Sequence, residues 1–189
     1  MVPLGVRLVL AALLAAAGAE PAAEPVPAEG GFAAFARPDL GFSVRYPRGW
    51  DIWVQGPSAW EARSLGWRVS FVGPAVPPLA TEPFRPVVFV ERFPRMGMGL
   101  PQYVAAHQEV ARRDQAAYRP VAAGPVGGGE RYRLEDAYEF NGTPMRKQTL
   151  FVRDGDGVFH VTAVAPESDW REDRRRFEGS LTSFARLSR

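Results

Sequence analysis

Histidine supplies much of the acid–base chemistry that enzymes use near neutral pH, and this chain has two, His107 and His160. His107 falls on the apolar side of an expected helix, and His160 falls in an apolar run typical of a central strand. A catalytic histidine needs a nucleophile or a carboxylate within hydrogen-bonding reach, and the sequence pattern places none beside either one. We therefore interpret both as partly buried, hydrogen-bonded side chains and predict that the chain is not an enzyme.

The segment 94–100 carries the residues most suited to a soft metal ion. Met96 and Met98, with His107 further along, offer the thioether and imidazole ligands that bind copper(I). Two methionines and one histidine are too few for a specific site. We predict instead a loop whose methionines pack or contact a partner.

The run Asp154-Gly-Asp-Gly157 resembles the start of a calcium-binding loop. The position that should hold a bidentate glutamate is Ala165, so a β-turn explains the run better. The chain has no cysteine, which excludes disulfides and thiolate metal sites. We predict no metal site and no cofactor.

Arginines crowd the expected closing helix: Arg171, Arg174, Arg175 and Arg176, with Glu172 able to pair with the last two. Two interpretations remain open at this point. The arginines form a solvated helix face, or they form a docking patch for acidic partners or anionic lipid headgroups.

Aromatic side chains suggest a second kind of site. Trp50 and Trp53 lie beside an expected turn, and Tyr103 lies on the inner face of the expected helix over 101–115. Together they predict a pocket between sheet and helix that suits a small apolar ligand.

The elements that must position these residues are clearest in the C-terminal third. Apolar and charged residues alternate along 132–140, which predicts a strand with one buried face; Asp136 interrupts the apolar face, and we place it near an edge. Asn141-Gly142 predicts a tight hairpin into a strand over 145–153. The run 158–165 is nearly all apolar and predicts a central strand covered on both faces.

A closing helix follows Pro166. Its large apolar residues recur at helical spacing, so they predict a stripe that packs on the sheet. They are Trp170, Phe177, Leu181 and Phe184. Further strands are expected over 42–46, 52–54, 60–63, 67–71, 87–93 and 118–126. We predict an α+β fold, an α/β/α sandwich with a mainly antiparallel sheet of about six or seven strands.

The first 31 residues differ from the rest. Residues 1–19 carry one arginine, a ten-residue apolar run and an Ala-x-Ala cleavage site, which predicts a signal peptide; an uncleaved N-terminal anchor is the alternative. Residues 20–31 predict a flexible linker rich in proline, alanine and glutamate, and 32–189 predict a single domain. We expect a periplasmic or secreted monomer with no stable membrane span after cleavage. Its formal net charge of +2 argues against a dedicated nucleic-acid binder.

Two segments resemble a known family. Gly41 to Trp50 resembles the opening of PsbP-like and DcrB-like domains, a strand that leads into a proline and a tryptophan. The stretch from Val152 through the 154–157 turn, and on to the tryptophan and phenylalanines of the closing helix, is similar to the PsbP ending. The similarity spans about 32–184.

The resemblance implies an α/β/α sandwich and a non-enzymatic role. Plant PsbP is a lumenal accessory subunit of photosystem II, and DcrB-like proteins are bacterial envelope proteins, often lipoproteins. This chain lacks the lipid-bearing cysteine of those lipoproteins, and its N-terminal segment does not match that of PsbP. We expect an exported accessory protein that stabilises or chaperones an envelope protein partner, with Met96, Met98, Arg171, Arg174 and Arg175 as contacts. The alternative is a small-ligand or metal-ion carrier that uses the pocket near Trp50, Trp53 and Tyr103.

Overall fold

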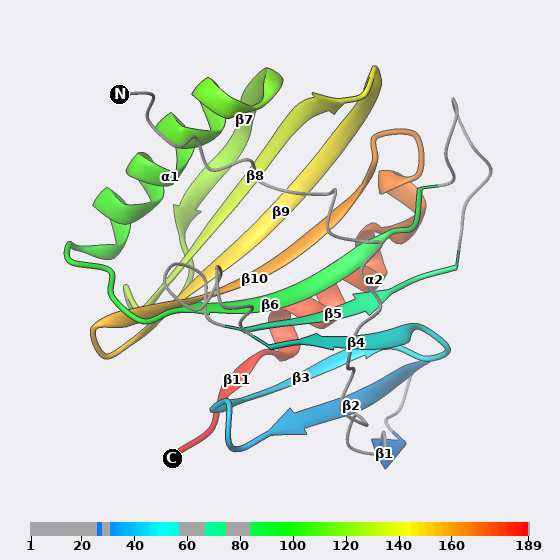
Figure 1. Ribbon diagram of the computed structural model, residues 1–189, viewed down its shortest axis with the longest axis vertical. Coiled ribbons are helices and arrows are strands. Elements are labelled where there is room, and N and C mark those ends of the chain that lie inside the picture. Colours follow the sequence, from blue (N-terminus) through cyan, green and yellow to red (C-terminus); the bar gives the residue numbers. More distant parts are fainter. Residues whose placement is uncertain (1–25, 28–30, 57–66, 75–83, 189) are drawn as a thin grey trace.

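The computed structural model describes residues 26–27, 31–56, 67–74 and 84–188 (Figure 1). The predicted signal peptide over 1–19 and the predicted strand over 60–63 lie outside these residues. In chain order the elements are β1 (Val26–Pro27), β2 (Phe32–Arg37), β3 (Phe42–Pro47), β4 (Asp51–Gln55), β5 (Arg68–Val72), β6 (Val87–Phe93), α1 (Leu100–Asp114), β7 (Ala116–Pro125), β8 (Arg131–Phe140), β9 (Thr143–Asp154), β10 (Gly157–Pro166), α2 (Trp170–Ser183) and β11 (Ala185–Arg186).

Seven strands form the main sheet, in the order β4-β5-β6-β10-β9-β8-β7, and every neighbouring pair is antiparallel. A shorter sheet has the order β1-β2-β3-β11. The α+β class and the antiparallel sheet predicted from the sequence are confirmed. β10 is the fourth of the seven strands and is buried along its whole length, as its apolar run predicted.

Two tight turns connect β8, β9 and β10 and fix their register. Asn141 and Gly142 have φ angles of +49° and +78°, the geometry that an asparagine–glycine hairpin favours. The second turn places Asp154 directly opposite Gly157. Because side chains alternate between the faces of a sheet, this register decides which polar residues of the three strands share a face.

The two faces of the main sheet are covered differently. α1 packs over β7, β8 and β9 on one face. α2 runs along the opposite face, where it also packs on β3 of the shorter sheet (Figure 1). α2 and the shorter sheet therefore form one layer, the main sheet a second and α1 a third.

Side chains of β10 point alternately to the two faces of the main sheet and so contribute to two separate hydrophobic cores. Phe159 and Val161 face α2, where they join the predicted stripe, whose members are all buried: Trp170, Phe177, Leu181 and Phe184. Val158 packs instead with residues of α1. Phe177 is fully buried, which confirms that the apolar stripe holds α2 against the sheet.

Some elements differ from the sequence-based prediction. Val26 and Pro27 pair with β2 inside the segment 20–31 that we expected to be a flexible linker. Edge strand β7 contains Pro120 and two register shifts, features that hinder pairing with another chain along a sheet edge.

Within the described residues, no helix is long and apolar enough to cross a bilayer.

Candidate functional site

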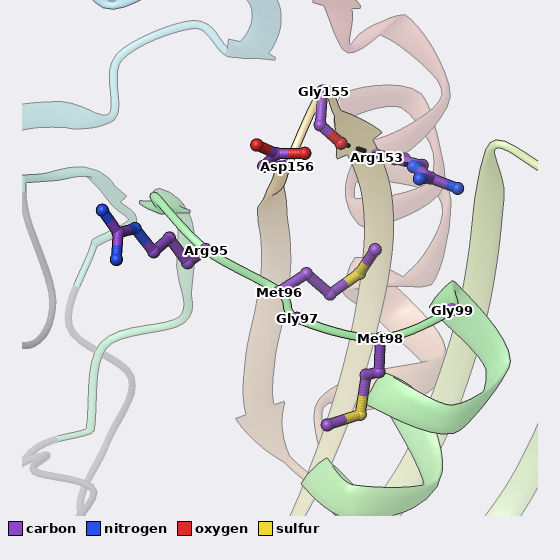
Figure 2. Close-up of a pocket in the computed structure, with 8 residues that line it drawn as sticks. All are labelled: Arg95, Met96, Gly97, Met98, Gly99, Arg153, Gly155 and Asp156. Carbon is purple, nitrogen blue, oxygen red and sulfur yellow. Dashed lines mark hydrogen bonds between the residues drawn. The ribbon is translucent and has the colours of Figure 1, made fainter.

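A hollow of about 370 Å³ lies where the loop before α1 passes the β9–β10 turn (Figure 2). Its lining residues are Arg95, Met96, Gly97, Met98, Gly99, Arg153, Gly155 and Asp156. The Met96 backbone N–H donates a hydrogen bond to the Asp156 carbonyl at 2.6 Å and ties the loop to the turn. Gly97 has a φ of +70°, which favours glycine, so the loop bends sharply between the two methionines.

The two methionines of this loop have different environments. Met96 is only 6% exposed and packs with Leu100 and Val104 of α1 and with Phe151 of β9. Met98 is 45% exposed, one of two exposed large apolar side chains among the described residues. Figure 2 shows the two thioether groups pointing in different directions. The prediction that both methionines contact a partner is therefore corrected for Met96, which belongs to the core.

The loop does not assemble a copper site with the nearby histidine. His107 lies two turns into α1, where its ring centroid is 5.3 Å from that of Phe151. Met98 lines the hollow, and its side chain extends away from that of Met96. Among the residues that the structure describes, no group of three or more His, Cys, Asp or Glu side chains is arranged to hold a metal ion.

Two arginines give the hollow a positive rim. Arg95 and Arg153 are both exposed, and neither forms an ion pair with any residue that the structure describes. Arg153 donates from Nε to the Gly155 carbonyl at 3.3 Å, which holds its stem at the turn. Figure 2 shows the two guanidinium groups on opposite sides of the hollow. Asp156 also lines the hollow, so its charged lining residues are two arginines and one aspartate.

Both histidines pack between α1 and the main sheet. The His160 Nε2 lies 2.9 Å from the Tyr103 hydroxyl, and the His160 and His107 ring centroids are 5.5 Å apart. Burial, with a smaller contribution from the charge of Lys147, lowers the pKa of His107 to about 3. Burial also lowers the pKa of His160 well below its usual value, with His107 and Lys147 contributing. Both rings are therefore neutral at neutral pH and help to seat α1.

A buried ion pair lies on the same face. The Lys147 Nζ is 3.3 Å from a carboxylate oxygen of Asp136; the two side chains are 4% and 0% exposed. Burial raises the pKa of Asp136 to about 6, against the lowering effect of Lys147. We expected Asp136 near a sheet edge. β8 does lie next to edge strand β7, but Asp136 is fully buried there, and the strand register sets it opposite Lys147.

The three aromatic residues of the predicted pocket do not meet. Trp50 is buried in the α2 core, with its ring 6.3 Å from that of Phe177. Tyr103 packs on His160 on the other face of the main sheet. Trp53 lies on edge strand β4, where the Arg85 guanidinium lies over its ring. The sheet separates Trp50 from Tyr103, so these side chains cannot line one pocket.

The predicted arginine contacts of α2 lie away from the hollow. Arg171, Arg174 and Arg175 are exposed in the first turns of α2, which begins just after β10 ends. The hollow lies at the other end of β10, beside Asp156. Ten residues of strand span roughly 30 Å. The two predicted contact regions are therefore separate surfaces.

Comparison with known proteins identifies the class of fold. No family model matches the chain, and no curated protein matches it. Several solved structures share its architecture at low sequence identity, and they include a PsbP protein, so the chain has a PsbP-like fold. The resemblance inferred from the sequence is confirmed at the level of fold.

Three solved structures illustrate the similarity. The Ran-binding protein Mog1p of Saccharomyces cerevisiae has a TM-score of 0.57 and 9% identity, over 83% of this chain and 96% of Mog1p. The cyanobacterial PsbP of Synechocystis has a TM-score of 0.56 and 12% identity, over 86% and 97%. LpqN of Mycobacterium tuberculosis, involved in cell envelope biogenesis, has a TM-score of 0.50 and 13% identity, over 87% and 90%.

Proposed function

We propose that this chain is an exported, non-enzymatic binding protein that holds an envelope protein partner at the hollow beside α1. The observation that carries the proposal is Met98, a large apolar side chain that is 45% exposed in a concave, arginine-rimmed site. Full burial of a side chain of this size is worth roughly 1.5–3 kcal/mol, so covering the exposed 45% of Met98 would stabilise a complex by about 1 kcal/mol.

The chemistry of the hollow indicates which partner it fits. A thioether adapts its shape to different apolar side chains, which suits recognition of segments rather than of one small molecule. Arg95 and Arg153 flank the site on opposite sides and lack carboxylate partners within the described residues. The partner segment therefore carries an apolar residue between acidic residues.

The comparisons support a binding role without naming a partner. Mog1p is described as a Ran-binding protein, and LpqN is described as involved in cell envelope biogenesis. From these neighbours we infer only that this fold can bind other proteins, because a fold alone does not determine function. The sequence pattern of residues 1–19 supports export.

Site-specific crosslinking tests the proposal. A photoreactive residue replaces Met98 in cells that make the protein, and the matched control places it at Val121, which is 41% exposed on edge strand β7. We expect one protein to be crosslinked from position 98 and not from position 121. Equal adducts at both positions, or none at 98, would remove the hollow as the contact site.

Native mass spectrometry of the protein from its envelope fraction gives an independent result. A mature chain that starts at Glu20 with a second protein attached supports export and partner binding. A bare chain with a small excess mass supports the alternative, a small-ligand carrier. The hollow is large enough for such a ligand, since its volume of about 370 Å³ falls in the usual range for ligand pockets.

A further inference from the structure

α1 is held on the main sheet by fewer large apolar side chains than α2. The buried residues of α1 are Leu100, Val104 and Ala111, whereas α2 buries two large aromatic rings, Trp170 and Phe177, in the larger core. Segments of a protein that bury few apolar contacts open at a lower free-energy cost than the rest of the fold. α1 is therefore the helix that leaves the sheet more readily.

The middle of α1 rests on a cluster of polar rings. His107 of α1 and His160 of β10 have ring centroids 5.5 Å apart, and the Tyr103 hydroxyl lies 2.9 Å from the His160 Nε2. The ring of Phe151 lies against both histidines, with its centroid 5.3 Å from that of His107 and 4.7 Å from that of His160. His160 is only 4% exposed. The two imidazoles therefore share one site beneath the helix, where water has little access.

The sheet offers no free carboxylate to balance a charge in this site. On the α1 side of strands β6, β8, β9 and β10, the carboxylates are Asp136 and Glu91. Asp136 already pairs with Lys147 at 3.3 Å, and Glu91 pairs with Arg68 at 2.7 Å. Arg153, further along β9, adds another cation at the hollow. An imidazolium in this site would therefore lack a counter-ion from these strands.

The helix and the edge strand offer no counter-ion either. The two acids of α1, Glu109 and Asp114, pair with Arg112 and Arg113 of the same helix. Tyr118 of β7 packs at the edge of the cluster and contributes a neutral hydroxyl. The charges that face the two histidines from the packed elements are thus already in pairs or are positive.

A proton on either ring would add a buried positive charge close to Lys147. Burial and the charge of Lys147 both lower the pKa of His107 and of His160. Burying an unpaired charge is costly, whereas a ring that is uncovered by the departure of α1 regains its water. We propose that protonation of His107 and His160 in mildly acidic solution releases α1 from the main sheet while α2 stays packed.

The connections of α1 are compatible with such a release. α1 ends at Asp114, and β7, which begins at Ala116, is the last strand of the main sheet. The loop before α1 carries Met96, which packs with Leu100 of the helix. Release therefore removes the packing beneath the hollow but breaks no pairing between the inner strands. It is independent of whether the hollow binds a partner.

The size of the effect follows from the groups that titrate. With a pKa near 6.5 once exposed, each histidine favours the open form by about 25-fold more at pH 5 than at pH 7. Asp136 acts in the opposite direction, because burial raises its pKa in the folded state to about 6. Its protonation favours the closed form by about 10-fold over the same interval. The opening of α1 should therefore become about 60-fold more favourable.

Amide hydrogen exchange followed by mass spectrometry tests the release. Measured rates are divided into the intrinsic rates at each pH, which gives protection factors for the two helices. Peptides from 100–114 should lose about 60-fold in protection between pH 7 and pH 5 and stay at least about 10-fold less protected than peptides from 170–183. Equal protection of both helices at pH 5 would overturn the proposal, because the domain would then open as a whole. Unchanged protection of α1 would overturn it as well.

Substitutions show whether the histidines are responsible. H107Q/H160Q removes both titrating rings, so α1 should lose no protection on acidification, and H107Q alone should leave a loss of about 2.5-fold. The matched control T162V removes the 3.1 Å hydrogen bond to Thr149 on the same face without changing a titrating group, and it should keep the wild-type pH dependence. Circular dichroism at pH 7 confirms that each variant folds. A wild-type loss of protection in both histidine variants would assign the effect to other groups and refute the proposal.

Discussion

The buried Asp136–Lys147 ion pair beneath α1 makes a contribution to stability that can be tested by substitution. Replacing Lys147 by methionine keeps most of the side-chain volume but leaves a fully buried carboxylate without its cation. Removing one partner of a buried pair destabilises proteins by roughly 3–5 kcal/mol, because the remaining charge stays desolvated. We expect K147M to lower the free energy of unfolding by about 3 kcal/mol at pH 8.

The pH dependence of this loss distinguishes a buried charge from simple loss of packing. The pKa of Asp136 is raised in the folded state to about 6, from 3.8. A carboxyl with a raised pKa adds stability that is fully present below pH 3.8 and is lost as the pH rises through the folded pKa. Without Lys147 the pKa of Asp136 rises further, so a proton replaces the lysine at mildly acidic pH. The cost of K147M should therefore fall below about 1 kcal/mol at pH 5.

Urea unfolding at pH 5 and pH 8 measures both quantities. The matched control is D136L/K147M, which removes both charges and should recover most of the stability at pH 8. A cost of K147M that does not change with pH would refute the argument. A double variant as unstable as the single variant would also refute it, because packing and not charge would then be responsible.

Three further predictions concern other parts of the fold. The pKa of His107 is lowered in the folded state to about 3, so its contribution to stability is lost as the pH falls below 6.5. Between pH 7 and pH 5 this loss amounts to about 2 kcal/mol of the free energy of unfolding. Urea melts of H107Q should therefore show a flatter pH dependence than those of wild type. F177A removes a fully buried ring of the α2 stripe and should cost about 3–5 kcal/mol; a cost under about 1 kcal/mol in a urea melt would contradict the packing of α2. Gly142 has a φ of +78°, so G142A should lower stability by about 1 kcal/mol in a thermal melt, whereas an alanine at the ordinary backbone position Gly124 should not.

Local sequence patterns were enough to predict most of the elements. Period-two alternation over 132–140, the Asn141-Gly142 turn and the apolar run over 158–165 gave three strands in their correct hairpins. The helical stripe that includes Phe177 predicted which side of α2 is buried. These features depend on neighbours a few residues apart, and such neighbours are set by backbone geometry and side-chain period alone.

The composition of the candidate site could not be predicted, because it depends on which strands become neighbours in the sheet, and local sequence patterns do not give that order. Met96 and Met98 have similar surroundings in the sequence. In the structure Met96 packs in the core formed by α1 and β9, whereas Met98 stays exposed. The sequence allowed Trp50 and Tyr103 to line one pocket, but the main sheet places them on opposite faces.

The sequence by itself determined the kinds and order of most elements of the main sheet and the side that α2 buries, because hydrophobic period and turn chemistry act locally; it did not predict β1, β2 or β11 of the shorter sheet. The tertiary structure decided that Asp136 meets Lys147, that His107 meets His160 across 53 residues, and that Arg119, Arg133 and Arg146 of three neighbouring strands share one face. The physical reason is that these contacts follow from the long-range pairing and register of strands. A change of one residue in the register of a strand would turn its side chains among these to the other face of the sheet.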